Sequence, residues 1–233
     1  SEWIEYLLHL FEFHSINSTA YDNRNSPTTG KYWLIKTFEV LKGIQNDVVL
    51  DGTVYLDETY FTKVRSKLVT KDGKKLRGIS RNKIGVGVAC NETKSIFIVT
   101  GTSKPSRKST KETYSQHIAR GSVLVHDDEH SHSILIEELE LESIVYPTAE
   151  TKELSDKDNP LYPVNNLHLL LKQFIRNHGA YDREHLQDWL NLFWFIMNEP
   201  KDKYDKVLKF IEMAVLSPKK VRYRDAMSSK HSK

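Results

Sequence analysis

The feature that most constrains the fold is an apolar stretch that runs into acidic residues at positions 54–61, Val-Tyr-Leu-Asp-Glu-Thr-Tyr-Phe. It predicts a short strand with Asp57 and Glu58 near its end. A buried carboxylate without a partner is costly, so an acid there is expected to meet a metal, a base or a helix end. The alternative is an edge strand on which Asp57 only caps the next turn.

A second stretch of the same kind lies at positions 122–128, Ser-Val-Leu-Val-His-Asp-Asp. It is followed along the chain by a polar helix start that carries Asn165, with Lys172 seven residues further on. Two carboxylates at strand ends and a polar group on a helix can hold a divalent ion with oxygen ligands. The sequence therefore predicts a metal site made by Asp57, Asp127 and Asn165.

Composition limits the class of protein. The 233 residues suit one sizeable domain and a small one, and 39% hydrophobic residues allow a packed core. The net charge is only +3, so contact with phosphate has to come from local clusters of Lys and Arg. The single cysteine, Cys90, excludes an internal disulfide framework and a Cys-rich zinc ribbon. With no signal peptide and no apolar run of membrane-spanning length, a reducing, cytoplasmic location is expected.

Residues 1–46 are expected to form a small helical region. Apolar spacing predicts helices near 3–13, 15–20 and 27–41, and Ser26-Pro27 is a typical helix start. Three short helices with tight turns indicate a helix-turn-helix unit, whose third helix would read DNA. A plain three-helix cap on the next domain is the alternative. The residues that the third helix would offer to DNA are Thr28, Thr29, Lys31, Tyr32 and Lys36.

The central part of the chain alternates strands and helices. The expected elements are strands at 54–57, 84–90 and 95–100, a helix at 110–119, a strand at 122–127, a helix at 134–141, a strand at 143–146 and a helix at 164–177. The first three strands would form an antiparallel meander, and the fourth would lie parallel to the first. This order is typical of the ribonuclease H-like fold, an α/β class.

Basic residues gather between the first two strands, around the turn signal Asp72-Gly73. Lys74, Lys75 and Arg77 could hold a nucleic-acid backbone near the acidic strand, or they could belong to a solvated loop. Two further helices are expected at 183–197 and 204–216. A basic tail that we expect to be mobile follows from Ser217. The expected domains are a DNA-binding region (1–46), a catalytic domain (47–200) and a C-terminal helix with this tail (201–233).

Three motifs in this order resemble the DDE-type insertion-sequence transposases. They are Leu-Asp-Glu-Thr-Tyr around Asp57, Val-Leu-Val-His-Asp ending at Asp127, and Val-Asn-Asn-Leu-His-Leu-Leu-Leu-Lys with Asn165 and Lys172. The likeness is to the branch in which asparagine replaces the last acid and lysine follows seven residues later, and it runs from about Trp3 to Asn198. Many relatives carry an N-terminal zinc ribbon, which this sequence does not show.

The resemblance implies a bacterial transposase that cleaves and joins double-stranded DNA at element ends, acting as a nucleoid-associated homo-oligomer. It also implies two Mg²⁺ ions, for which Mn²⁺ can substitute. Asp57 would bind both ions, Asp127 one, and Asn165 would complete the second site with a neutral oxygen. Lys172 would contact DNA phosphate. The sequence also allows a domesticated or inactive DNA-binding protein, another ribonuclease H-like nuclease, or a structural protein.

The sequence leaves the roles of several polar residues near these motifs open. Glu58 is expected to point to the other face of its strand from Asp57, with a direct metal role as the alternative. His168 shares its helix face with Asn165 and Lys172, so it could touch DNA or metal, or only pack. Three histidines at the end of the second acidic stretch are expected to be polar loop residues rather than zinc ligands: His126, His130 and His132.

Overall fold

The computed structural model describes residues 2–62, 72–73, 78–79, 82–155, 157–178 and 183–228. Contacts within the chain define two compact units. One is Gln45–Leu170, and the other combines Ser1–Ile44 with Leu171–Lys233. These units are groupings by contact, and the functional boundaries expected from the sequence stay a prediction. No helix in the described part of the chain is long and apolar enough to cross a membrane.

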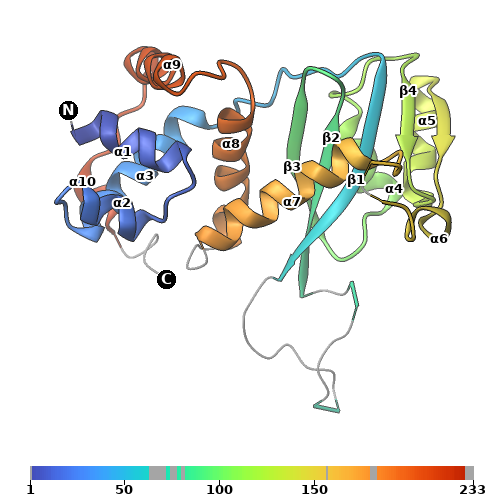
Figure 1. The fold of residues 1–233 in the computed structure, drawn as a ribbon, viewed down its shortest axis with the longest axis horizontal. Coiled ribbons are helices and arrows are strands. Elements are labelled where there is room, and N and C mark those ends of the chain that lie inside the picture. The colour runs from blue at the N-terminus through green and yellow to red at the C-terminus, as the bar shows by residue number, and fades with distance from the viewer. Residues whose placement is uncertain are drawn as a thin grey trace. The chain divides into compact units, whose positions relative to one another are not determined.

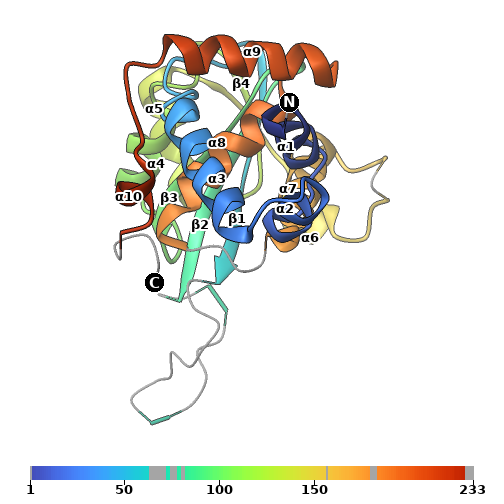
Figure 2. The ribbon, with the colours of Figure 1, turned by 90° about the vertical axis from the view of Figure 1, so that its left-hand side faces the viewer.

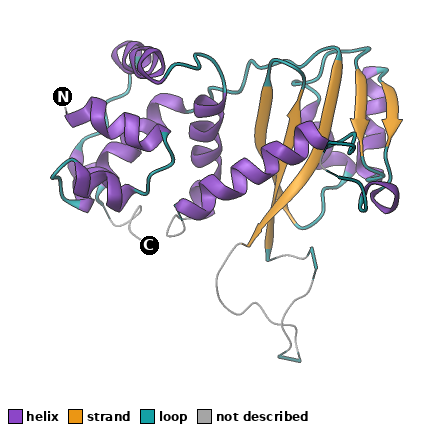
Figure 3. Ribbon diagram, viewed as in Figure 1, coloured by secondary structure: helices purple, strands orange, loops and turns teal. Residues whose placement is uncertain are grey.

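The unit Gln45–Leu170 contains a five-stranded sheet, drawn in orange in Figure 3. Its strands are β1 Thr53–Thr62, β2 Lys83–Cys90, β3 Ser95–Thr102, β4 Val123–His126 and β5 Glu142–Val145. Their order in the sheet is β3-β2-β1-β4-β5. β1, β2 and β3 pair antiparallel, whereas β4 is parallel to β1 and β5 is parallel to β4. This α/β topology is that of the ribonuclease H-like fold, so the predicted fold class is confirmed (Figure 1).

Short helices cover one face of the sheet, the face that is turned away from the viewer in Figure 1. They are α4 Arg107–Tyr114, the 3₁₀ turn η1 His130–His132 and α5 Ser133–Leu139. A capping box between Ser106 and Ser109 starts α4. Burial of apolar side chains from both layers holds this face together. The core here includes Val54, Leu56, Ala89, Ile96, Tyr114, Ile118, Leu124, Leu135 and Leu141.

One glycine allows a large side chain from α4 to lie over β2, on the helix-covered face of the sheet. A Cβ placed on Gly87 in β2 would collide with the ring and hydroxyl of Tyr114. Tyr114 is fully buried, and its hydroxyl reaches Glu58 on β1. Glycine at this position therefore makes room for a contact that belongs to the polar network described below.

The helix α7, Tyr162–Asn177, passes in front of the sheet in Figure 1. Its residues up to Leu170 belong to the sheet unit by contact, and those from Leu171 belong to the other unit. A short helix, α6 Thr148–Thr151, lies before it in the chain and was not expected from the sequence.

The second unit is helical (Figure 2). Besides the end of α7 it contains α1 Glu2–Phe11, α2 Ile16–Asp22, α3 Pro27–Leu41, η2 Arg183–His185, α8 Leu186–Met197, α9 Lys203–Leu216 and α10 Tyr223–Ala226. The three N-terminal helices and the two after α7 are confirmed. Ser15 and Ser26 cap α2 and α3 by accepting hydrogen bonds from backbone N–H groups, because the first turn of a helix leaves these groups unpaired.

The expectation of a mobile tail from Ser217 is wrong for the residues described there. The Tyr32 hydroxyl donates to the Val221 carbonyl at 2.9 Å, and the rings of Tyr32 and Tyr223 lie 5.2 Å apart. The tail therefore packs on α3 and forms α10. It also contacts Tyr32, which was predicted from the sequence to face DNA.

Candidate metal-binding active site

Asp57 and Asp127 are neighbours across two parallel strands. Leu56 of β1 is in register with His126 of β4, so the residues that follow them stand side by side. Neighbouring residues of paired strands point to the same face, and Asp57 is on the face opposite to buried Leu56. The two carboxylates therefore lie next to each other, Asp57 within β1 and Asp127 directly after the end of β4.

Crowding and burial disfavour ionisation of these acids. Burial, together with the nearby charges of Asp127 and Glu58, raises the pKa of Asp57 to about 7. Burial also raises the pKa of Asp127. Ionisation of both carboxyl groups is unfavourable in such a place unless a cation binds between them. Their oxygen donors suit a hard divalent ion such as Mg²⁺, so the residues fit the metal expected from the sequence.

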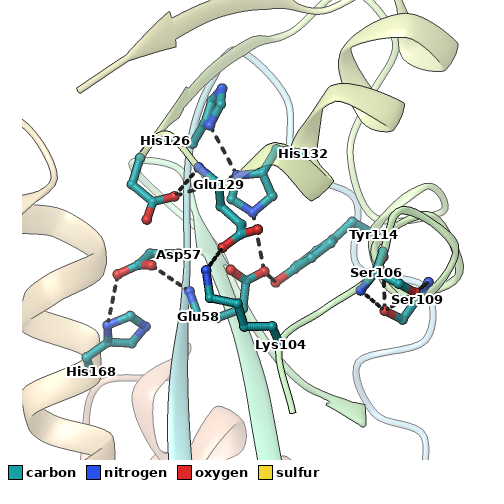
Figure 4. A network of polar contacts seen from close by, with 11 residues as sticks. Asp57, Glu58, Lys104, Ser106, Ser109, Tyr114, His126, Glu129, His132 and His168 are labelled. Carbon is teal, nitrogen blue, oxygen red and sulfur yellow. Dashed lines mark hydrogen bonds and ion pairs between the residues drawn. The ribbon is translucent and has the colours of Figure 1, made fainter. Parts of the chain in front are cut away.

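The helix α7 brings His168 to Asp57. His168 is buried, and its Nδ1 lies 3.6 Å from Asp57 Oδ2 (Figure 4). Asn165, one turn earlier, and Lys172, one turn later, are both exposed. Buried His168 is thus a neighbour of the Asp57 carboxylate, and the roles of His168, Asn165 and Lys172 stay predictions. Lys172 lies in the part of α7 that belongs to the helical unit.

Glu58 faces away from Asp57, as strand alternation predicts. Its side chain is only 3% exposed. It accepts a hydrogen bond from the Tyr114 hydroxyl at 2.9 Å, and its Oε1 lies 3.4 Å from His132 Nε2. A buried carboxylate is therefore held by two polar partners on the helix-covered face.

Two histidines expected in a polar loop are instead buried, so that interpretation was wrong for His126 and His132. Their Nδ1 atoms lie 3.1 Å apart, and His132 Nδ1 is 3.9 Å from Asp127 Oδ1. His126 is the last residue of β4 and His132 ends the following 3₁₀ turn, which brings the two rings together (Figure 4). His130, by contrast, is exposed. The spacing of six residues across a strand end was the available signal.

The two rings differ in proton affinity. Burial, together with the neighbouring His132, lowers the pKa of His126 to about 4. Burial also lowers the pKa of His132, but the hydrogen bond to Glu58 and the charges of Glu58, Asp127 and Asp57 outweigh it and raise the pKa above its ordinary value. His132 is therefore the ring of the pair that binds a proton more readily.

The acids that follow Asp127 differ in their surroundings. Asp127 Oδ1 accepts a hydrogen bond from the Glu129 backbone N–H at 3.1 Å. Glu129 forms an ion pair with Lys104 at 3.0 Å, and Asp128 is exposed. The turn after β4 thus fixes the orientation of Asp127.

The residues predicted to bind DNA on α3 lie in different settings. Thr28 is exposed, whereas the Thr29 hydroxyl is 3.0 Å from the capping hydroxyl of Ser26. Lys31 is partly exposed. Lys36 Nζ lies 4.7 Å from the Tyr32 ring centre and borders a cavity of about 410 Å³ within the helical unit. Lys74, Lys75 and Arg77 lie outside the described residues.

The sequence matches no protein-family model and no curated protein. Solved structures of the Mos1 transposase resemble the fold. The catalytic domain with raltegravir and Mn has a TM-score of 0.39 and 13% identity, over 82% of this chain and 92% of that one. A pre-cleavage Mos1 transpososome has a TM-score of 0.36 and 12% identity, over 93% and 74%. The mariner Mos1 paired-end complex with Mg has a TM-score of 0.37 and 15% identity, over 87% and 72%. Likeness at these values supports no conclusion about function.

Proposed function

We propose that this chain is a DDE-type transposase of a bacterial insertion sequence, which cleaves DNA at element ends and joins it to a target. The observation that carries the proposal is the adjacency of Asp57 and Asp127 in a ribonuclease H-like fold, with the pKa of both raised. Two ionised carboxylates so close together repel each other unless a cation lies between them. Enzymes that cleave phosphodiester bonds use divalent cations bound by carboxylates.

Asp57, Asp127 and Asn165 would hold two Mg²⁺ ions, or Mn²⁺ in their place. When bound, the ions supply activation of a water or 3′-hydroxyl and stabilisation of the leaving oxygen. Asp57 would contribute to both ions and Asp127 to one. Asn165 offers only a neutral carbonyl oxygen, so it would bind more weakly than a glutamate.

Other residues of the chain would bind and orient. His168, 3.6 Å from Asp57 Oδ2, would keep that carboxylate in one orientation. Lys172, exposed on α7, would contact a DNA phosphate as a point charge. Thr28, on the first turn of α3, is exposed, and α3 would act as the recognition helix. Assembly as a homo-oligomer on paired ends, in the bacterial nucleoid, is part of the proposal.

The test is cleavage and strand transfer by purified protein with Mg²⁺ or Mn²⁺. The substrate is labelled DNA carrying the sequences that flank the gene, together with supercoiled target plasmid. We expect Asp57→Ala to abolish both products while circular dichroism shows an unchanged fold. Asp128→Asn, which alters an exposed neighbour of Asp127, is the matched control and should remain active. Unchanged cleavage by the Asp57→Ala protein would defeat the assignment.

The same assay separates the rival functions. Cleavage without strand-transfer products, or preference for an RNA–DNA hybrid, would indicate another ribonuclease H-like nuclease. DNA binding without any metal-dependent product would indicate an inactive or domesticated relative.

A further inference from the structure

Two buried histidines on the helix-covered face of the sheet and Asp127, directly after the end of β4, form a second group of candidate metal ligands. The Nδ1 atoms of His126 and His132 and a carboxylate oxygen of Asp127 all lie within 4.8 Å of one another. Both rings are buried, whereas the Asp127 side chain is 28% exposed. An ion could therefore be enclosed by the rings and still be reached from the side of Asp127.

The other nitrogen of each ring is already engaged. His132 Nε2 lies 3.4 Å from Glu58 Oε1, and the Tyr114 hydroxyl donates a hydrogen bond to the same oxygen. His126 Nε2 lies 3.1 Å from the Ser143 hydroxyl. Metal-binding histidines commonly donate their second ring N–H to a carboxylate or another oxygen, which fixes the tautomer and directs the remaining nitrogen at the metal. The two Nδ1 atoms here lie 3.1 Å from each other, and His132 Nδ1 lies 3.9 Å from Asp127 Oδ1.

The separation of the two nitrogens fits a shared ion. Two ligand atoms bound at about 2.0–2.2 Å to one ion lie about 3–3.5 Å apart. The observed 3.1 Å between His126 Nδ1 and His132 Nδ1 is in this range, although a single shared proton would give a similar distance. A third donor, Asp127 Oδ1 at 3.9 Å from His132 Nδ1, would complete a three-ligand set for the ion.

We propose that His126 Nδ1, His132 Nδ1 and Asp127 Oδ1 bind one transition-metal ion of the zinc class. Two imidazole nitrogens and one carboxylate suit Zn²⁺, Co²⁺ or Mn²⁺, whereas Mg²⁺ prefers oxygen ligands alone. The ion would tie the end of β4 to the turn before α5 and would hold Asp127 in place. The site rests on its own geometry and not on the proposed transposase activity, although both use Asp127.

The experiment is a Co²⁺ titration of metal-free protein, followed by visible absorption. A second histidine and acid group, His9, His14 and Asp22, could also take up the ion, so all proteins carry His14→Gln. We expect about one equivalent of Co²⁺ to give an absorption band that Zn²⁺ removes and millimolar Mg²⁺ does not. The band should be retained by His130→Gln, an exposed neighbour and matched control.

The substitutions His126→Gln and His132→Gln should each weaken Co²⁺ binding at least tenfold. If either protein folds poorly by circular dichroism, Ser143→Ala supplies a milder test, because loss of an outer partner lowers metal affinity about 10- to 100-fold. A wild-type protein without the band, or an unchanged affinity in the folded histidine variants, would overturn the site.

The outcome is separable from the transposase proposal. Asp57→Asn should abolish DNA cleavage but keep the Co²⁺ band, because Asp57 is not among the three ligands. Loss of the band in this variant would contradict the separate site, whereas absence of cleavage in the wild-type protein would leave the metal titration interpretable.

Discussion

Replacing Asp57 by asparagine should stabilise the metal-free protein, and the gain should grow with pH. Asparagine resembles the protonated carboxyl in size and keeps an oxygen that can accept the hydrogen bond from the Glu58 N–H, 2.7 Å away. The variant therefore removes the charge and little else. The pKa of Asp57 is about 7 in the folded protein, against an ordinary value of 3.8.

The sign and size of the effect follow from these two values. Between about pH 4 and pH 7 the folded protein keeps a proton that the unfolded chain has lost, so stability falls as pH rises through this interval. Each tenfold change in proton affinity is worth about 1.36 kcal/mol, which gives an upper limit of roughly 4 kcal/mol. Because 25% of the Asp57 side chain stays exposed, we expect a gain of about 2–4 kcal/mol in the variant above pH 8.

The assay is urea unfolding of both proteins in EDTA at several pH values. Their stabilities should coincide below about pH 3, where the carboxyl is protonated in both states, and diverge as pH rises through about 4 to 7. Added Mg²⁺ at about pH 8 should stabilise the wild-type protein more than Asp57→Asn, because only the native carboxylate pair binds the ion fully. A stability difference that stays constant with pH, or a variant that is less stable throughout, would refute the reasoning.

Three further predictions concern residues that do different work. Lys172→Ala should lower DNA cleavage at least tenfold while leaving the stabilisation by Mg²⁺ unchanged; an equal loss of Mg²⁺ stabilisation in melting curves would argue against a role confined to phosphate. Gly87→Ala should cost about 1–3 kcal/mol in urea unfolding because the new Cβ meets the Tyr114 hydroxyl, and part of the loss should be recovered in a Tyr114→Phe background; equal costs in both backgrounds would exclude that clash. Lys206 Nζ donates to the carbonyls of Phe195, Ile196 and Asn198, so Lys206→Met should destabilise the helical unit by about 1–3 kcal/mol in thermal melts, whereas exposed Lys209→Met should have little effect.

The order of strands and helices was readable from the sequence because apolar periodicity is strong there. The run Ile84 to Cys90 is buried along nearly its whole length, and the stripe Trp189, Leu190, Phe193 on α8 is core as expected. Adjacency of Asp57 and Asp127 was also predictable, since the fourth strand was expected to lie parallel to the first. The expected strand end at Asp57 was wrong, because β1 continues to Thr62 and only Asp127 follows a strand end.

The parts that the sequence did not give depend on contacts between distant residues. Tyr32 reads as an exposed aromatic residue on α3 until the tail at Val221 covers it. His126 and His132 read as loop residues because the 3₁₀ turn that folds one ring onto the other has no apolar period. The role of Glu58 as their partner could not be predicted, because it depends on Tyr114, which lies against Gly87 and donates a hydrogen bond to Glu58.

The central claim is that Asp57 and Asp127 share a divalent cation. The most direct measurement is the anomalous X-ray signal of Mn²⁺ in crystals of the protein grown or soaked with that ion. The account predicts a peak within bonding distance of a carboxylate oxygen from each residue, and its loss in Asp57→Asn. Mn²⁺ that binds elsewhere in well-ordered crystals, with no peak between these two carboxylates, would contradict it.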